Sequence, residues 1–287
     1  MKKLKANIYY ENGYAGVTVG ALLLPQVTLL VDAPLQPEQG RQWLADLEQA
    51  GAAPRRLVLN LDAHPDRTLG VQTMEAQVLA HREVTRQIRR RAAIFKALKQ
   101  ESGAEWEETS GLSGLRWILP RLTFSEQVGL QFDEAELRME HRPGPSPATS
   151  WLLVPQDGVV FVGDTLTVDE PPFLANADIG AWLEQLDLLS GRDYKDYTII
   201  AGRGGKAGAE DIAAMRRFIK DVHSRLQRLD GKKSANEEID KLAAKLNEKF
   251  RAPVKRQVLF GQRLRHGLHS YFARYHTAAG RAARQAA

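Results

Sequence analysis

The sequence predicts an α/β fold, arranged as a four-layer αββα sandwich that is followed by a C-terminal helical extension. Three observations predict it. Strand-like and helix-like segments alternate along the chain, the strand-like segments gather in two groups, and the last part of the chain has helical patterns alone. The 287 residues and the 43% hydrophobic content suffice for a sizeable core. We therefore expect a sandwich over residues 1–208 and a helical region, residues 209–287, packed on it.

The first half of the chain is expected to supply one sheet and the helices beside it. Its strands are short apolar or alternating runs that end in polar clusters, at residues 1–31, 55–60 and 76–80. Residues 37–50 predict an amphipathic helix, because Trp43, Leu44 and Leu47 fall on one face. A second helix is predicted over residues 82–101.

The second half repeats this alternation after an irregular segment at residues 102–126. Strands are expected at residues 127–142, 150–162 and 197–201, and a helix at residues 177–189. The turn sequence Gln156-Asp157-Gly158 predicts that the second of these strands folds back as a hairpin. From residue 209 onward the pattern predicts three helices, which are broken near Gly231 and at Ala252-Pro253.

Charge is distributed unevenly along the chain. Residues 1–205 carry a net charge of −6 and residues 206–287 carry +11, which together give the overall +5. The basic residues are spread along predicted helices rather than clustered. We therefore interpret them mainly as neutralising an acidic body, within one chain or across a homodimer, and keep nucleic-acid binding as the alternative.

Composition excludes several functional classes. The chain has no Cys, which removes disulfides, thiol nucleophiles and Cys-based zinc sites, and which fits a reducing compartment. No apolar run reaches the roughly 18 residues of a membrane span. The basic start Met1-Lys2-Lys3-Leu4-Lys5 is not followed by the apolar core of a signal peptide. We expect a cytoplasmic protein that contacts no membrane.

The segment Leu61-Asp62-Ala63-His64-Pro65-Asp66-Arg67 is the strongest candidate site. It follows the apolar run Leu57-Val58-Leu59, so it lies at the end of a predicted buried strand. Because side chains alternate between the two faces of an extended segment, Asp62, His64 and Asp66 can point toward the same place. Imidazole and carboxylate groups at a strand end are the ligands of zinc, iron or manganese sites, and a plain polar loop is the alternative.

This segment resembles, in register, the His-x-His-x-Asp-His motif of the metallo-β-lactamase superfamily. Four further segments are similar to segments of that family in the same order, namely Val31-Asp32-Ala33-Pro34 and residues 143–150, 161–166 and 201–205. The resemblance spans about residues 5–225. It implies the αββα fold and, if the protein is an enzyme, a hydrolase built on two metal ions.

This sequence departs from the family at the positions of the metal ligands. The residues there are Asp62, His64, Asp66, Arg67, Pro145, Asp164 and Arg203. Arginine stays protonated and proline has no side-chain donor, so neither ligates a metal. A normal dinuclear zinc centre is therefore not expected. Arg67 and Arg203 would stand at the second metal position, where their guanidiniums can bridge Asp66 and Asp164. The resemblance thus implies a metal site that is replaced, at least in part, by salt bridges.

Two outcomes for metal stay open at this point. Either no metal binds, or Asp62, His64 and Asp164 hold one divalent ion (zinc, iron or manganese) with water completing the shell. In the second case Asp66 would be the general base for the attacking water. His81, at a predicted helix start, is a weaker ligand candidate, as is His141 in the strand before the 143–150 segment.

Three functional hypotheses follow. The first is a metallo-β-lactamase-fold protein that has lost dinuclear chemistry and binds a small polar or anionic ligand, or a partner, at the old pocket. The second is the mononuclear hydrolase, and the third is a nucleic-acid-associated protein that uses the basic C-terminal helices. A Ser hydrolase is not expected, because Ser146 and Ser150 have no nearby His and Asp arrangement to activate them.

Overall fold

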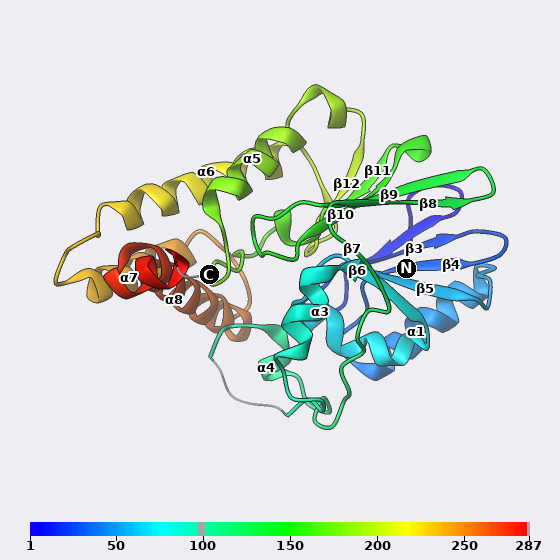
Figure 1. Ribbon diagram of the computed structural model, residues 1–287, viewed down its shortest axis with the longest axis horizontal. Coiled ribbons are helices and arrows are strands. Elements are labelled where there is room, and N and C mark those ends of the chain that lie inside the picture. Colours follow the sequence, from blue (N-terminus) through cyan, green and yellow to red (C-terminus); the bar gives the residue numbers. More distant parts are fainter. Residues whose placement is uncertain (97–100, 286–287) are drawn as a thin grey trace.

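The predicted four-layer arrangement is confirmed. A computed structural model of the protein, which describes residues 1–96 and 101–285, contains two sheets that face each other and helices on both outer sides. In Figure 1 the layers follow one another as α1 and α3, the first sheet, the second sheet, and α5 with α6. Among the described residues, no helix is long and apolar enough to cross a membrane.

The first sheet follows the order of the chain. Its strands are β1 (Lys2–Lys3), β2 (Ile8–Glu11), β3 (Val19–Leu23), β4 (Thr28–Val31), β5 (Arg56–Asn60), β6 (Gln77–His81) and β7 (Leu122–Phe124). Strands β1 to β4 pair antiparallel, and β4 to β7 pair parallel. The carboxyl ends of β4 and β5 therefore meet at the same edge of the sheet.

The second sheet runs in the spatial order β13-β12-β11-β10-β9-β8. Its strands are β8 (Gln127–Phe132), β9 (Ala135–His141), β10 (Ser150–Val154), β11 (Val159–Phe161), β12 (Thr198–Ile200) and β13 (Lys206–Ala207). Strands β11 and β12 are its parallel pair. The predicted turn at 156–158 joins β10 to β11, and Gly158 there has a positive φ of 59°.

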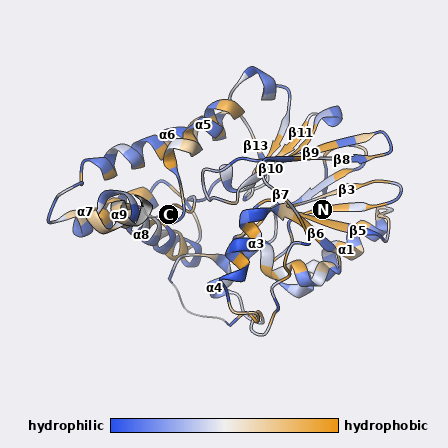
Figure 2. Ribbon diagram, in the orientation of Figure 1, coloured by the Kyte–Doolittle hydropathy of each residue, from blue (hydrophilic) through white to orange (hydrophobic). Residues whose placement is uncertain are grey.

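Helices cover the outer faces and extend the fold at one end. They are α1 (Pro37–Gln49), α2 (Pro65–Thr68), α3 (Arg82–Arg89), α4 (Glu105–Glu108), α5 (Ile179–Leu189), α6 (Ala209–Gln227), α7 (Ala235–Asn247), α8 (Val254–His276) and α9 (Ala278–Gln285). Figure 1 shows α7 and α8 at the end of the molecule farthest from the N-terminus. In Figure 2 the strands are largely hydrophobic, whereas the outer helices show many hydrophilic segments.

The three largest apolar clusters among the described residues hold most of the layers together. The first lies between the sheets, where Leu29 and Leu59 pack with Leu152 and Phe161. In the second, Trp43 and Leu47 of α1 cover the outer face of the first sheet. The third lies outside the second sheet, and residues from α5, α6, α7 and α8 all enter it. Because the C-terminal helices share this core, they pack on the sandwich as one unit with it.

Three expectations on element boundaries are wrong. The helix predicted over residues 82–101 ends at Arg89, where Arg91 turns inward to donate to the Ala63 carbonyl; residues 97–100 lie outside the described part. The segment 102–126, predicted to be irregular, contains α4 and β7. The tail forms four helices among the described residues rather than three, because Thr277 adopts an extended backbone (φ −98°, ψ 155°) between α8 and α9.

Candidate functional site

The candidate site lies where parallel strands of both sheets end. Asp32 follows β4, residues 61–67 follow β5, Asp164 follows β11 and Arg203 comes after β12. Because carboxyl ends of adjacent parallel strands lie at one edge, these side chains meet even though they are far apart in sequence. His64 caps the short helix α2, with Pro65 at its first position, which turns Asp66 and Arg67 into the site.

Arg67 is a fully buried cation that joins the two sheets. Its Nη1 donates to Oδ2 of Asp32 at 2.6 Å, and its Nη2 donates to Oδ1 of Asp164. Asp32 also accepts from the Leu61 amide at 3.0 Å and from the Asn60 side chain at 3.2 Å. The contact of Arg67 with Asp164 agrees with the predicted salt bridge, whereas its pairing with Asp32 was not foreseen.

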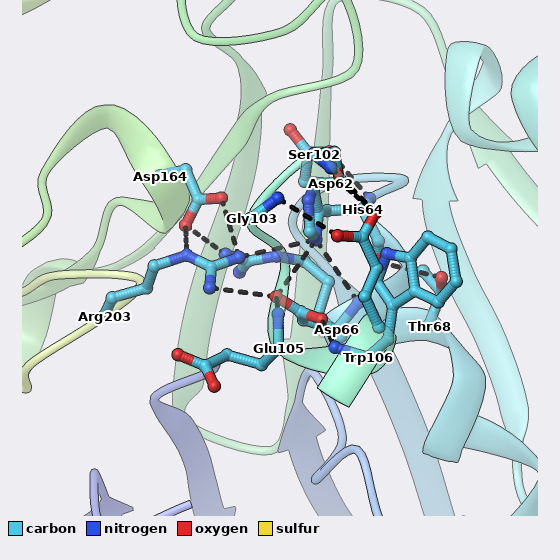
Figure 3. Close-up of polar contacts among 12 residues, drawn as sticks. Asp62, His64, Asp66, Thr68, Ser102, Gly103, Glu105, Trp106, Asp164 and Arg203 are labelled. Carbon is cyan, nitrogen blue, oxygen red and sulfur yellow. Dashed lines mark hydrogen bonds and ion pairs between the residues drawn. The ribbon is translucent and has the colours of Figure 1, made fainter. Parts of the chain in front are cut away.

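Arg203 is the second buried guanidinium, only 1% exposed, and it lies between two carboxylates (Figure 3). Its Nη1 donates to Oδ2 of Asp66 at 3.0 Å, and its Nε donates to Oδ1 of Asp164 at 3.2 Å. Its Nη2 lies 3.4 Å from Nδ1 of His64. The structure thus brings together Asp66, Arg67, Asp164, Arg203 and His64 as expected from the sequence.

The oxygens of Asp66 and Asp62 are occupied by protein donors. Asp66 is fully buried and accepts from the Trp106 amide at 2.9 Å, in addition to Arg203. Oδ2 of Asp62 accepts from the Ser146 hydroxyl at 2.6 Å and from the Thr149 hydroxyl at 2.8 Å. The loop before β10 thus places the Ser146 hydroxyl on the Asp62 carboxylate, a contact that the sequence did not reveal.

The surroundings of Nδ1 indicate the protonation state of His64. Its Nδ1 accepts from the Asp66 amide at 3.3 Å and faces Nη2 of Arg203, and both of these groups are donors. Burial lowers the pKa of His64 to about 4; Asp66 opposes this shift and Arg203 adds to it. The ring is therefore neutral near pH 7, with its proton on Nε2.

Opposing effects set the charges of the buried network. Burial alone would raise the pKa of Asp164, but Arg203 and Arg67 outweigh it and hold that pKa well below the usual range. Burial raises the pKa of Asp32, although Arg67 and two hydrogen bonds oppose the rise. Asp164 is therefore the firmly ionised centre between two guanidiniums, and both arginines stay charged.

The donor atoms at this site are largely occupied by hydrogen bonds and ion pairs within the protein. Two permanent cations are in direct contact with Asp164, which would repel a dication. Oδ2 of Asp62 accepts from two hydroxyls and its Oδ1 accepts from the His64 amide, while Nδ1 of His64 accepts from the Asp66 amide. Within residues 1–96 and 101–285, no group of three or more His, Cys, Asp or Glu side chains is arranged to hold a metal ion.

A cavity of about 490 Å³ opens beside the network. Asp62, His64, Ser146 and Asp164 form part of its lining, whereas Arg67, Asp66 and Arg203 do not line it. Its other walls come from the end of α3, from Trp106 and Trp117, from Phe173 and from α8. A ligand in this cavity would thus meet a small polar floor and largely aromatic walls.

A second buried network, which the sequence did not reveal, ties α8 to the site. Arg263 is fully buried; its Nη1 donates to Glu170 at 2.8 Å and its Nε donates to the Gly103 carbonyl at 2.9 Å. Its guanidinium lies 4.2 Å from the centre of the Phe173 ring, and Arg203 lies 4.7 Å from that ring. The one available signal was a lone Arg on the apolar face of the last long helix.

The weaker candidates His81 and His141 lie outside the cavity lining and contact each other. Their rings stack at 3.7 Å with an interplanar angle of 8°. His81 begins α3, because its Nδ1 accepts from the Glu83 amide at 3.4 Å, and its Nε2 lies 2.8 Å from the Ser125 carbonyl. Burial, together with His141, lowers the pKa of His81 to about 4. Both rings are thus engaged with each other and with neighbouring backbone carbonyls.

This pKa predicts a loss of stability in acid. A histidine whose folded pKa of about 4 lies below its unfolded value of 6.5 binds fewer protons when folded, so stability falls as the pH drops through that window. We expect His81→Asn, which keeps a helix-capping acceptor, to reduce the loss between pH 7 and pH 4 by up to about 3 kcal/mol. Urea unfolding at several pH values measures this, and parallel curves for wild type and variant would contradict it.

Comparisons with known proteins agree with this architecture. The family model described as "Metallo-beta-lactamase superfamily" matches residues 26–202. The fold is similar to the crystal structure of metallo-beta-lactamase IND-7, with a TM-score of 0.59 and 14% identity over 77% of this chain and 96% of that chain. It is also similar to the metallo-beta-lactamase from Pontibacter korlensis, with a TM-score of 0.57 and 15% identity over 77% of this chain and 98% of that chain.

A third similar structure is that of DIM-1 metallo-beta-lactamase exposed to ceftazidime, with a TM-score of 0.59 and 13% identity over 77% of this chain and 96% of that chain. No curated protein sequence matches the chain. At such low identities these likenesses concern the fold.

Proposed function

The chain belongs to the metallo-beta-lactamase superfamily, and we propose that it works without a dinuclear metal centre, as a protein that binds a small polar or anionic ligand. The observation that carries this proposal is the pair of guanidiniums, Arg67 and Arg203, buried against Asp164. They supply the positive charge that two metal ions would otherwise supply. Arginine has no lone pair to offer and stays charged, so this replacement is chemical as well as electrostatic.

The remaining polar groups do not form a hydrolytic centre. Asp66, the expected general base, is fully buried and bonded to Arg203 and to the Trp106 amide, so it does not reach a water molecule in the cavity. Arg67 and Arg203 are too deeply buried to polarise a bound carbonyl. Ser146 has a carboxylate beside it, but His64 is not bonded to its hydroxyl, so a nucleophile–base–orienter chain is missing from the described contacts.

The other two hypotheses have less support. A single metal ion on Asp62, His64 and Asp164 would have to displace hydroxyl and guanidinium donors already in place. Nucleic-acid binding would need free cations, yet several basic side chains of the C-terminal helices form ion pairs. Arg216 pairs with Asp187 of α5, Arg265 pairs with Asp240 of α7, and Arg225 pairs with Asp221 within α6. We also propose a cytoplasmic location, which the Cys-free composition fits.

Metal analysis tests the proposal directly. We expect the purified full-length protein, incubated with excess zinc and desalted, to retain fewer than two equivalents of zinc, and to show weak or no hydrolysis of lactam and phosphodiester substrates. A zinc-loaded metallo-beta-lactamase treated in parallel is the positive control. Two bound equivalents, with an activity that chelation abolishes and zinc restores, would overturn the proposal.

A further inference from the structure

Building on the proposed function, we infer that the cavity takes an organic anion with a flat aromatic body, and that α8 forms part of this binding site. The anionic group would lie against the cationic end of α3, and the aromatic body against the indole and phenyl walls. The inference rests on three features of the cavity: unpaired cations at one side, aromatic walls, and the contribution of the C-terminal region.

The cations of the cavity come from the end of α3 and the residues after it. Arg90, Arg91 and Lys96 line the cavity, and no ion pair of these three with a carboxylate occurs within the described part of the chain. The acidic residues of the lining are already engaged, since Asp164 is held by two guanidiniums and Asp62 by two hydroxyls. The free charge that a ligand meets is therefore positive.

Arg91 is the central cation of this group. Its guanidinium lies 4.5 Å from the centre of the Trp117 ring and donates to the Ala63 carbonyl at 2.8 Å. Burial lowers the pKa of Arg91 to about 10, and Asp62 offsets only part of this effect. A partly buried cation without a bonded carboxylate is costly, and an anion placed beside it would reduce that cost.

The aromatic walls suit a flat apolar group. Trp117 and Trp106 both lie near Phe95, with ring centres 5.8 Å and 5.4 Å from it, and Phe173 also lines the cavity. The guanidiniums of Arg203 and Arg263 both lie against the Phe173 ring. A cavity of about 490 Å³ falls within the range of small-molecule sites, roughly 300–1,000 Å³.

Helix α8 supplies the last part of the wall. His266 lines the cavity one turn after Arg263, whose buried contacts with Glu170 and Gly103 fix the helix against the site. His64, the N-cap of α2, lines the cavity as well. The ligand would thus be enclosed by groups from α2, α3 and α8, and the C-terminal helices would help to determine which ligand binds.

The test is a calorimetric titration of the full-length, zinc-free protein with 2-naphthoate as the probe. We expect one molecule to bind per chain, and the neutral analogue 2-naphthalenemethanol to bind at least ten times more weakly. Arg91→Gln should weaken 2-naphthoate binding about tenfold, and the exposed pair Arg90→Gln/Lys96→Gln should weaken it several-fold without affecting folding. His266→Ala should also weaken it, which tests the contribution of α8.

Arg89→Gln is the matched control, because Arg89 is exposed on the same helix and does not line the cavity; it should bind like wild type. The inference is overturned if naphthoate does not bind, if the alcohol binds equally well, or if the Arg90/Lys96 pair and Arg91→Gln leave the affinity unchanged in folded protein. If these outcomes occur in zinc-free protein, the proposal that the protein works without a dinuclear metal centre still stands. Binding that requires two equivalents of zinc would instead overturn the proposed function.

Discussion

A chain that ends at residue 208 is expected not to fold. The largest apolar core lies outside the second sheet, where Trp182 and Leu186 of α5 pack with Ile219 of α6 and with Leu264 and Leu268 of α8, all at most 1% exposed. Removing the C-terminal helices would uncover this face. Each large side chain loses about 1.5–3 kcal/mol of burial, and a few such losses exceed the total stability of a typical domain, about 5–15 kcal/mol.

The truncation also removes a buried counter-charge. Glu170 is 4% exposed and would lose its partner Arg263. Near-UV circular dichroism and urea unfolding of residues 1–208 would measure the loss of tertiary structure. A chain ending at residue 276, which lacks α9 alone, is the control and should unfold cooperatively near the wild-type midpoint. Cooperative unfolding of the 1–208 chain would contradict the joint core and would make the sandwich an independent domain.

Replacing Arg203 by alanine is expected to give the largest loss of stability of any single substitution at the site. The variant leaves Asp66 without its cation and Asp164 with one of its two. Removing one partner of a buried pair costs about 3–5 kcal/mol, because an uncompensated charge remains in a desolvated position. Arg67→Ala should act similarly through Asp32 and Asp164.

Thermal and urea unfolding would measure these losses. Arg216→Ala is the matched control, since Arg216 pairs with Asp187 at the surface, where water screens the pair and its loss changes stability little. The double variant Arg203→Ala/Asp66→Ala should lose less than the sum of the two single variants, because the pair interacts directly. Unchanged midpoints in both the Arg67 and the Arg203 variants would show that the network does not stabilise the fold.

Much of the fold could be predicted from local patterns in the sequence. The period-two and apolar runs identified β5 and most other strands, and the apolar face of residues 37–49 identified α1, because burial on one face leaves a periodic trace in the sequence. The strand-end position of residues 61–67 and the arginines at ligand positions also followed from sequence. Boundaries were less predictable: α3 stops at Arg89, and the Arg91 side chain after it bonds to the distant Ala63 carbonyl.

The sequence by itself therefore determined the αββα architecture and the fact that Arg67 and Arg203 stand where metal ligands would. Only the tertiary structure decided which polar residues pair with one another. Arg67 joins Asp32 across 35 residues, Ser146 joins Asp62 across 84, and Arg263 reaches Gly103 across 160. Such contacts depend on which strands pair and on where α8 packs, and a charged residue leaves no periodic signal of its partner. The direction of the His64 proton depends in turn on the Asp66 amide and Arg203 around it.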